Sequence, residues 1–150
     1  MRSHDLDSFS RELVEIMPLM FREFAKREDN QLTRGKISFP QMVALDYVSR
    51  HSLVKMTDLA KVLSVKTSSA TVLVDRLIRQ KMLSRERDEK DRRVVWVGCT
   101  PKGRKIVRYI MEQKRRSIKQ IFGPLTELER QQYLSVIQKV RDTLLREQGR

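Results

Sequence analysis

Cysteine and histidine are scarce in this sequence of 150 residues. It contains one cysteine, Cys99, and two histidines, His4 and His51. A single thiol cannot form a disulfide within the chain, and a structural zinc site usually needs four cysteine or histidine ligands. We therefore expect no intrachain disulfide and no bound metal. Cys99 is interpreted as a small buried hydrophobic residue, with a redox-sensing thiol as the alternative.

Glycine is also sparse, and the five glycines are scattered at positions 35, 98, 103, 123 and 149. This spacing excludes a glycine-rich phosphate loop. The nucleophile-elbow motif G-x-S-x-G and the zinc-protease motif H-E-x-x-H are both missing. Because catalytic sites normally carry some such signature, we expect no enzymatic activity, no catalytic residue and no cofactor.

Long apolar runs are missing as well. None approaches the roughly 20 residues that a helix needs to cross a bilayer. The N-terminal segment MRSHDLDSFSREL is polar and of mixed charge, without the apolar stretch that a signal peptide needs after its basic start. From these absences we expect a cytoplasmic protein with no membrane partner.

Positive charge, in contrast, is abundant. The chain has 32 Lys and Arg against 19 Asp and Glu, a net charge of +13, which attracts polyanions. This total alone is compatible with DNA, RNA, an anionic membrane or an inert basic surface. Between Arg76 and Lys105, however, eleven basic and four acidic residues give a net charge of +7. Such a concentration in a fifth of the chain argues against a uniformly basic surface.

Apolar periodicity predicts a mainly helical protein with one strand pair. The predicted helices cover about residues 5–30, 38–51, 58–63, 67–82, 101–122 and 126 onward, and the predicted strands cover 83–87 and 94–100. Pro18 should kink the first helix or divide it near Met17. The first and last helices are amphipathic and have no partner in the central unit, so each needs an apolar surface to pack against.

Several residues mark the ends of these helices. Ser38 with Gln41, and Thr126 with Glu129, have the spacing of capping boxes. Thr57 is expected to cap the short helix, and Thr100 followed by Pro101 to open the next long one. His51 is expected to cap the carbonyl groups at the end of the second helix.

Two helices joined by a short turn and followed by a charged hairpin have the layout of a winged helix-turn-helix. The second helix, about 10–12 Å across, fits a major groove about 12 Å wide and should enter it by its N-terminal end. That end offers short hydroxyl groups beside a cation, which suit base edges and phosphates. The residues expected to contact DNA are Lys66, Thr67, Ser68, Ser69, Thr71 and Arg76 on the helix, and Arg92 and Arg93 at the hairpin tip.

Each of these assignments has a structural alternative. Thr67 or Ser68 could instead cap the helix, and the rest of the face could simply be solvated. At the hairpin tip, Asp91 could form a salt bridge with an arginine, which is compatible with Asp91 aiming Arg93. If Arg93 and its neighbour Arg92 contact DNA, the minor groove with its high negative potential is the place for them.

The run MTDLAKVLSVKTSSATVLVDRLIRQKMLSRERDEKDRRVVWVGCTPKG resembles the MarR family of bacterial and archaeal regulators. The matching residues are Thr57, Leu59 and Ala60, the stretch Leu73 to Leu77, and Asp91, Arg93, Thr100 and Gly103. The resemblance covers about residues 38–105 in motif and the whole chain in layout. It implies that Arg93 is the wing-tip arginine, that Asp91 orients it, and that the helix from Thr67 enters the major groove.

The resemblance also implies an organisation and a function. A winged helix-turn-helix lobe of residues 38–100 would be flanked by a helical dimerisation lobe of residues 1–37 and 101–150. The expected function is that of a sequence-specific regulator, with repression favoured, acting as a homodimer on a near-palindromic site in double-stranded DNA. A small phenolic or anionic effector is implied between the lobes. Candidate lining residues are Met17, Phe21, Phe24 and Phe39, for which an ordinary core position is the alternative.

Two positions depart from the family pattern. Met82 stands where the family usually has glycine after the second helix of the motif, and a left-handed conformation there would suit methionine poorly. Cys99 stands where the family usually has leucine before the strand-ending threonine. The turn into the wing is therefore the part of the motif for which the resemblance predicts least.

Three other classes of protein stay open at this point. A sequence-independent architectural or RNA-binding protein would show no preference among duplexes. A winged-helix protein-interaction module would not need the basic wing segment. A basic membrane-surface protein would place Trp and Phe opposite its cations, but the single tryptophan, Trp96, lies in a predicted wing strand.

Overall fold

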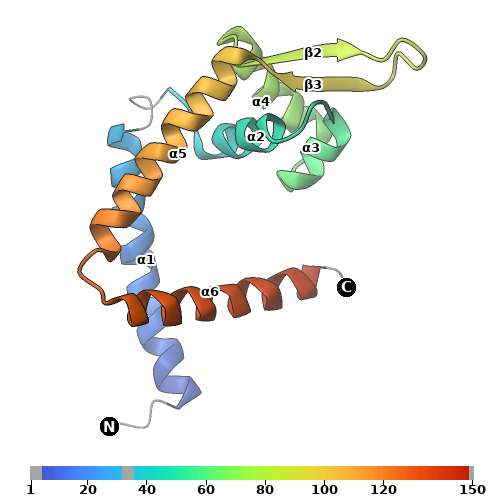
Figure 1. The fold of residues 1–150 in the computed structure, drawn as a ribbon. Coiled ribbons are helices and arrows are strands. Elements are labelled where there is room, and N and C mark those ends of the chain that lie inside the picture. The colour runs from blue at the N-terminus through green and yellow to red at the C-terminus, as the bar shows by residue number, and fades with distance from the viewer. Residues whose placement is uncertain (1–4, 32–35, 149–150) are drawn as a thin grey trace. The chain divides into compact units, whose positions relative to one another are not determined.

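The computed structural model describes residues 5–31 and 36–148. It is mainly helical with one small sheet, as expected, and divides into two compact units, residues 1–113 and 114–150. The elements are α1 (Leu6–Gln31), α2 (Phe39–Ser49), β1 (Val54–Lys55), α3 (Met56–Val62), α4 (Thr67–Arg79), β2 (Leu83–Arg87), β3 (Val95–Cys99), α5 (Pro101–Phe122) and α6 (Glu127–Gln148) (Figure 1).

The sheet has three antiparallel strands in the order β1-β3-β2. Strands β2 and β3 form the predicted hairpin, with Leu83 opposite Cys99 and Arg87 opposite Val95. We call this hairpin, residues 83–99, the wing (Figure 1). The sequence did not predict β1, whose two residues pair with Val97 and Trp96 of β3. Two residues are too few for the alternation by which strands are recognised.

The hydrophobic core of the first unit lies between α2, α3, α4, the sheet and the first turns of α5. Its fully buried large side chains include Leu45, Leu59, Leu77, Leu83 and Ile110. Burying a side chain of this size stabilises the fold by about 1.5–3 kcal/mol. The face of α4 that contributes Leu77 is thereby fixed, and the opposite face of the same helix is left to solvent.

The predicted capping boxes are both confirmed. Ser38 Oγ accepts the N–H of Gln41 at 3.4 Å, and Gln41 Oε1 accepts the N–H of Ser38 at 2.8 Å. Thr126 and Glu129 exchange the same bonds at 3.3 and 2.7 Å. The ring nitrogen Nδ1 of His51 lies 2.7 Å from the carbonyl oxygen of Tyr47, which agrees with its predicted role at the end of α2.

The expectation for the start of α3 is wrong, and one of the two alternatives for Pro18 is excluded. Thr57 does not cap α3: the helix begins at Met56, directly after β1, with Lys55 as its N-cap and no side-chain cap among the described residues. The pairing of Val54 and Lys55 with β3 fixes this earlier start. Helix α1 is not divided at Pro18, which lies inside a continuous helix although it has no N–H to donate to the preceding turn. A kink at Pro18, the other outcome expected from the sequence, stays a prediction.

Met82 does not take the left-handed conformation at the end of α4. The helix stops at Arg79, and the left-handed residue is Lys81, with φ of 60°. The N–H of Lys81 donates to the carbonyl of Ile78 at 2.8 Å, and that of Met82 to the carbonyl of Leu77 at 2.9 Å. These two bonds form a Schellman motif, in which Met82 follows the left-handed residue and is buried.

The turn after α4 is tied to the start of α5. Thr100, the N-cap of α5, donates its backbone N–H to the carbonyl of Met82 at 3.1 Å and its hydroxyl to the carbonyl of Lys81 at 2.8 Å. Its Oγ1 accepts the N–H of Gly103 at 3.0 Å, as predicted for a capping threonine. A Cβ at Gly103 would lie 2.1 Å from the Met82 carbonyl oxygen, so only glycine allows this approach. We call this set of contacts the junction.

The second unit contains the end of α5 and all of α6. The rings of Phe122 and Tyr133 pack at a centroid distance of 5.1 Å. The Arg130 guanidinium donates to the carbonyl oxygens of Phe122, at 3.4 Å, and Leu125, so it caps the end of α5. These contacts hold the turn between α5 and α6, which contains Gly123 and Pro124 as expected from the sequence.

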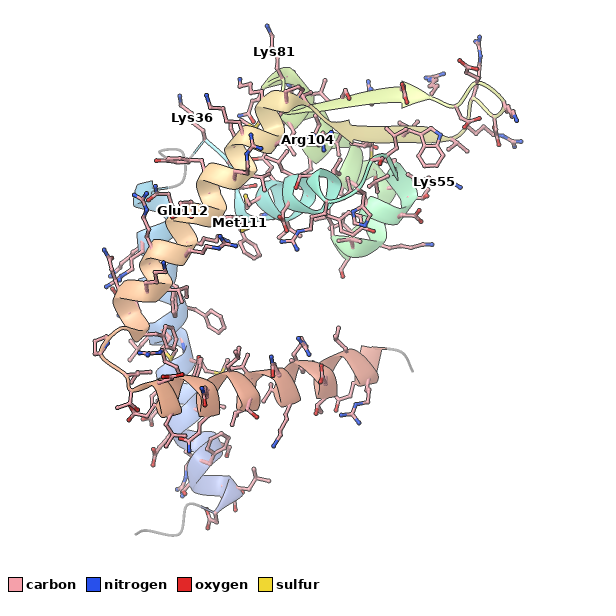
Figure 2. The ribbon with its side chains drawn as sticks, viewed as in Figure 1. Lys36, Lys55, Lys81, Arg104, Met111 and Glu112 are labelled. Carbon is pink, nitrogen blue, oxygen red and sulfur yellow. The ribbon has the colours of Figure 1, made fainter. Side chains whose placement is uncertain are left out.

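The left-handed conformation of Lys81 generates a test of stability. Figure 2 shows its side chain projecting away from the turn. Replacing it with glycine (Lys81→Gly) relieves the steric cost at Cβ, which exceeds the entropy that glycine loses on folding. We expect the free energy of unfolding to rise by about 0.5–1 kcal/mol in urea denaturation. Lys81→Ala, which removes the charge but keeps Cβ, is the control. Equal stability of the two variants would contradict the explanation.

Candidate nucleic-acid interface

The solvent-facing side of α4 carries the residues that the sequence singles out. Ala70, Val74 and Leu77 are buried on the opposite side. The exposed residues are Lys66, Thr67, Ser68, Ser69 and Arg76. Thr71 is half-buried, and its hydroxyl donates to the carbonyl of Thr67 at 2.9 Å. That contact leaves its methyl group and the acceptor side of its oxygen for any ligand.

The N-terminus of α4 is not capped by its own hydroxyl residues. Lys66 is the N-cap, and its side chain makes no capping hydrogen bond. The alternative roles of Thr67 and Ser68 as caps are therefore wrong. The free N–H groups of a first turn carry a partial positive charge, which favours a phosphate at this end of the helix.

The wing tip holds Arg93 as expected. Asp91 Oδ1 accepts the backbone N–H of Arg93 at 3.0 Å and its Nε–H at 3.3 Å. The Arg93 side chain is nevertheless 93% exposed. Arg92, next to it, is exposed as well. The predicted ion pair thus leaves the guanidinium open to solvent on its other sides.

Asp88, which was not among the residues predicted from the sequence, organises the wing turn. Its Oδ1 accepts the backbone N–H groups of Lys90 at 2.9 Å and Asp91 at 3.0 Å, and its Oδ2 accepts the indole N–H of Trp96 at 3.0 Å. The bond from Trp96, then the two backbone bonds, and then the charge of Lys55 lower the pKa of Asp88 from its ordinary value of 3.8. The sequence did contain a local signal for this role. An Asp side chain often accepts the backbone N–H of the residue two positions later, which forms an Asx turn.

An ion pair between α4 and the wing was also missed. Arg85 of β2 donates from Nη1 to Asp75 Oδ1 of α4 at 2.7 Å. Both side chains are about half exposed, so the pair contributes at most about 1 kcal/mol to stability. Its consequence is geometric, because it joins the base of the wing to the exposed side of α4.

Val72 is a third residue of this surface that was not predicted from the sequence. It lies on the same face of α4 as Ser68 and Arg76, and it is 56% exposed. The sequence carried a signal, since Val72 does not share the spacing of the buried positions of this helix. An exposed apolar side chain among hydroxyl groups can contact the methyl group of thymine.

Two cavities show which of these residues come together. The first, of about 300 Å³, lies where α3, α4 and the wing meet and is lined by Lys55, Met56, Thr57, Thr67, Thr71, Arg85, Arg93, Val94 and Val95. The wing-tip arginine and the start of α4 therefore border one space. The second, of about 370 Å³, is lined by Lys36, Ser38, Gln41, Arg76, Arg79 and Gln80. It places three cations beside the C-terminal half of α4.

The residues expected to bind an effector are not gathered in this structure. Met17 and Phe21 on α1 and Phe39 on α2 are 40%, 64% and 68% exposed, and Phe24 is half-buried. The residues lining the two cavities above include none of the four. Their role in binding a ligand stays a prediction.

Cys99 packs as a buried residue, in agreement with its interpretation. It is 7% exposed, and burial raises the pKa of its thiol, which disfavours the reactive thiolate. In residues 5–31 and 36–148 no group of three or more His, Cys, Asp or Glu is placed to hold a metal ion. None of the helices described is long and apolar enough to cross a membrane.

The lowered pKa of Asp88 generates a pH prediction. Because the folded state lowers the pKa of Asp88, its carboxylate stabilises the wing turn fully at pH values above the ordinary pKa of 3.8. This stabilisation is lost as the pH falls through the lower pKa of the folded state. Trp96 is the only tryptophan, so its fluorescence should change with a midpoint below 3.8. Asp88→Asn should lack this transition. Coincident loss of far-UV circular dichroism would mean global unfolding and contradict the local assignment.

Comparisons with known proteins agree with this geometry. The model of the MarR family matches residues 37–95. The uncharacterized HTH-type transcriptional regulator YwhA of Bacillus subtilis is 23% identical over 136 residues, which are 91% of this chain and 98% of that protein.

Solved structures show the same fold. A MarR family protein from Bacillus stearothermophilus superposes with a TM-score of 0.82 at 23% identity, covering 94% of this chain and 99% of that one. BpsR of Bordetella bronchiseptica, whose DNA binding is regulated by 6-hydroxynicotinic acid, gives a TM-score of 0.70 at 21% identity, covering 87% and 98%. With fold, wing motif and relatives in agreement, residues 37–95 match the MarR family model, the chain has the fold of MarR family proteins, and it is similar to HTH-type transcriptional regulators.

Proposed function

We propose that the protein is a sequence-specific repressor that binds a near-palindromic operator as a homodimer. The observation that carries the proposal is the cavity at which the uncapped start of α4 meets Arg93 of the wing. A helix that can enter a major groove and a cation that can enter the neighbouring minor groove border one surface. The concentration of positive charge between residues 76 and 105 covers the same elements.

The proposed DNA contacts differ in the part of the duplex that each residue suits. Lys66 and the N–H groups of the first turn of α4 suit phosphate, which fixes position without discriminating sequence. Ser68, Ser69 and Arg76 suit base edges in the major groove, and Val72 suits a thymine methyl group. Arg93, held by Asp91, suits a narrow minor groove. Occupation of the operator by such a protein represses a gene when it excludes the polymerase.

The homodimer is supported by apolar surface on both terminal helices. Exposed large apolar residues are Leu6, Phe9, Leu13, Val14, Ile16, Met17, Leu19, Met20 and Phe21 on α1, and Leu128, Tyr133, Leu134, Val136, Ile137, Val140, Leu144 and Leu145 on α6. Soluble monomers rarely expose so much contiguous apolar surface, and a second copy would cover it. Two-fold symmetry then places two α4 helices in successive major grooves, about 34 Å apart.

A small phenolic or anionic effector is the third part of the proposal. Its support is the regulation of BpsR by 6-hydroxynicotinic acid, together with the apolar residues of α1 that the described core does not use. A ligand that binds one separation of the two DNA-binding lobes better than another would change operator affinity by that difference. We expect the protein to be cytoplasmic, because a regulator acts where its DNA operator lies.

Selection from a pool of random duplexes, followed by sequencing, tests the operator. We expect a near-palindromic site with half-sites about 34 Å apart. Arg93→Ala should bind that site more weakly by about 1–3 kcal/mol, because the wing contact is lost. Affinity should also fall steeply with salt. Light scattering on the same preparation should give twice the chain mass of 17.8 kDa.

The other outcomes separate the rival classes. Salt-sensitive binding without an enriched sequence would favour an architectural or RNA-binding protein. Indifference to charge reversal in the wing would favour a protein-interaction module, and binding to anionic vesicles rather than duplexes would favour a membrane-surface protein. A monomer in light scattering would contradict the two-fold arrangement.

The effector site is tested at Phe21, which is exposed and therefore contributes little to the core. In Phe21→Ala, release from the selected operator by 6-hydroxynicotinic acid or salicylate should need a higher ligand concentration, by about tenfold for a loss of 1.4 kcal/mol. Leu19→Ala, an exposed neighbour outside the candidate set, is the control. A loss of stability with an unchanged ligand response would remove the support for this pocket.

A further inference from the structure

The wing contains a chain of hydrogen bonds that begins at Trp96 and ends at Arg93. We propose that Trp96 and Asp88 are positioning residues, which fix Arg93 in the orientation that contacts DNA. This inference rests on the proposed function, because it assigns a role toward the same DNA surface. Its first link is the indole N–H of Trp96, which donates to Asp88 Oδ2 at 3.0 Å.

The two carboxylate oxygens of Asp88 accept hydrogen bonds from different partners. Oδ2 is engaged by Trp96, while Oδ1 accepts the backbone N–H groups of Lys90 and Asp91. The backbone of Asp88 closes the turn as well, because its N–H donates to the carbonyl of Val94 at 3.0 Å. The carboxylate therefore fixes both the path of the turn and the place of the residue that follows it, Asp91.

Asp91 transmits this position to Arg93. Its carbonyl accepts the N–H of Val94 at 2.9 Å, and its Oδ1 accepts both the backbone N–H and the Nε–H of Arg93. The Arg93 side chain is 93% exposed, so packing contributes little to its orientation. Polar contacts at the tip must supply that order, and their geometry depends on Asp88.

Trp96 connects the tip to the body of the sheet. It lies on the central strand β3, opposite Lys55 of β1 and Glu86 of β2. The ammonium group of Lys55 lies 5.4 Å from the centre of the indole ring, within the range of a cation–π contact. Figure 2 shows Lys55 at the end of the lobe from which the wing extends. The indole is thereby held at its ring and directs its N–H toward the turn.

Ordering of Arg93 in the free protein matters for affinity. A long side chain that is already oriented loses less conformational entropy when it binds. Trp96→Phe removes the N–H but keeps an aromatic ring beneath Lys55, and it changes no charge. Asp88→Asn keeps one acceptor oxygen and places an NH2 group against the indole or the backbone donors, so one of the two tasks fails. It also removes a negative charge, which by itself would strengthen binding to a polyanion.

The experiment measures the affinity of wild type, Trp96→Phe, Asp88→Asn and the double variant for one selected duplex, each with Arg93 and with Arg93→Ala. We expect each single variant to bind about 3- to 10-fold more weakly, with no further loss in the double variant. In the Arg93→Ala background Trp96→Phe should change the affinity by less than about twofold, because the group that it positions is gone. Asp88→Asn should not weaken binding in that background, and its lost negative charge should if anything strengthen it. Equal losses in both backgrounds would mean a merely structural role and would overturn the proposal.

A second measurement needs no DNA. Nitrogen-15 relaxation of the Arg93 Nε–H should show a lower order parameter in Trp96→Phe than in wild type, while circular dichroism and urea denaturation show an intact fold. An unchanged order parameter would overturn the positioning role even if the operator proposal holds. If wild type binds no duplex but Arg93 becomes more mobile in the variant, the operator proposal fails and the contact chain stands.

Discussion

The carbonyl groups of Lys81 and Met82 are the point on which the arrangement of α4 and the wing depends. The end of α4 meets the end of β3 and the first turn of α5 there, although Lys81 and Thr100 are 19 residues apart in the chain. Thr100 uses its backbone and its hydroxyl to hold both carbonyls, and Gly103 allows α5 to approach because it lacks Cβ. Strand β2 leaves the same turn directly. The direction of the wing relative to α4 is therefore set by this junction, and the Asp75–Arg85 pair adds a second tie farther along.

Much of the fold could be predicted because its signals are local. The capping boxes at Ser38 and Thr126, the Thr100–Pro101 helix start and the alternating β-branched residues of β3 each act within four or five residues. Such interactions are visible in a sequence, since the partners lie at fixed spacings. The exposed face of α4 follows from the same reasoning, because the spacing of its buried residues leaves only one side for Ser68, Ser69 and Arg76.

What the sequence could not show depends on pairing between distant segments. Strand β1 exists because two residues meet β3, and that pairing also moved the start of α3 to Met56. The left-handed residue proved to be Lys81, because the Schellman motif counts from the last helical residue, Arg79, and not from the family's glycine position. The partners Trp96 and Asp88 are eight residues apart on opposite sides of a hairpin turn, a separation at which no side-chain pattern is periodic.

Helix α5 begins at the junction. It runs without a break for 22 residues from the anchored first turn into the second unit, so its length is about 33 Å. Its first turns are held by more than Thr100, because Val107 and Ile110 are buried in the core of the first unit. The first half of α5 therefore belongs to the same packed body as α4 and the wing.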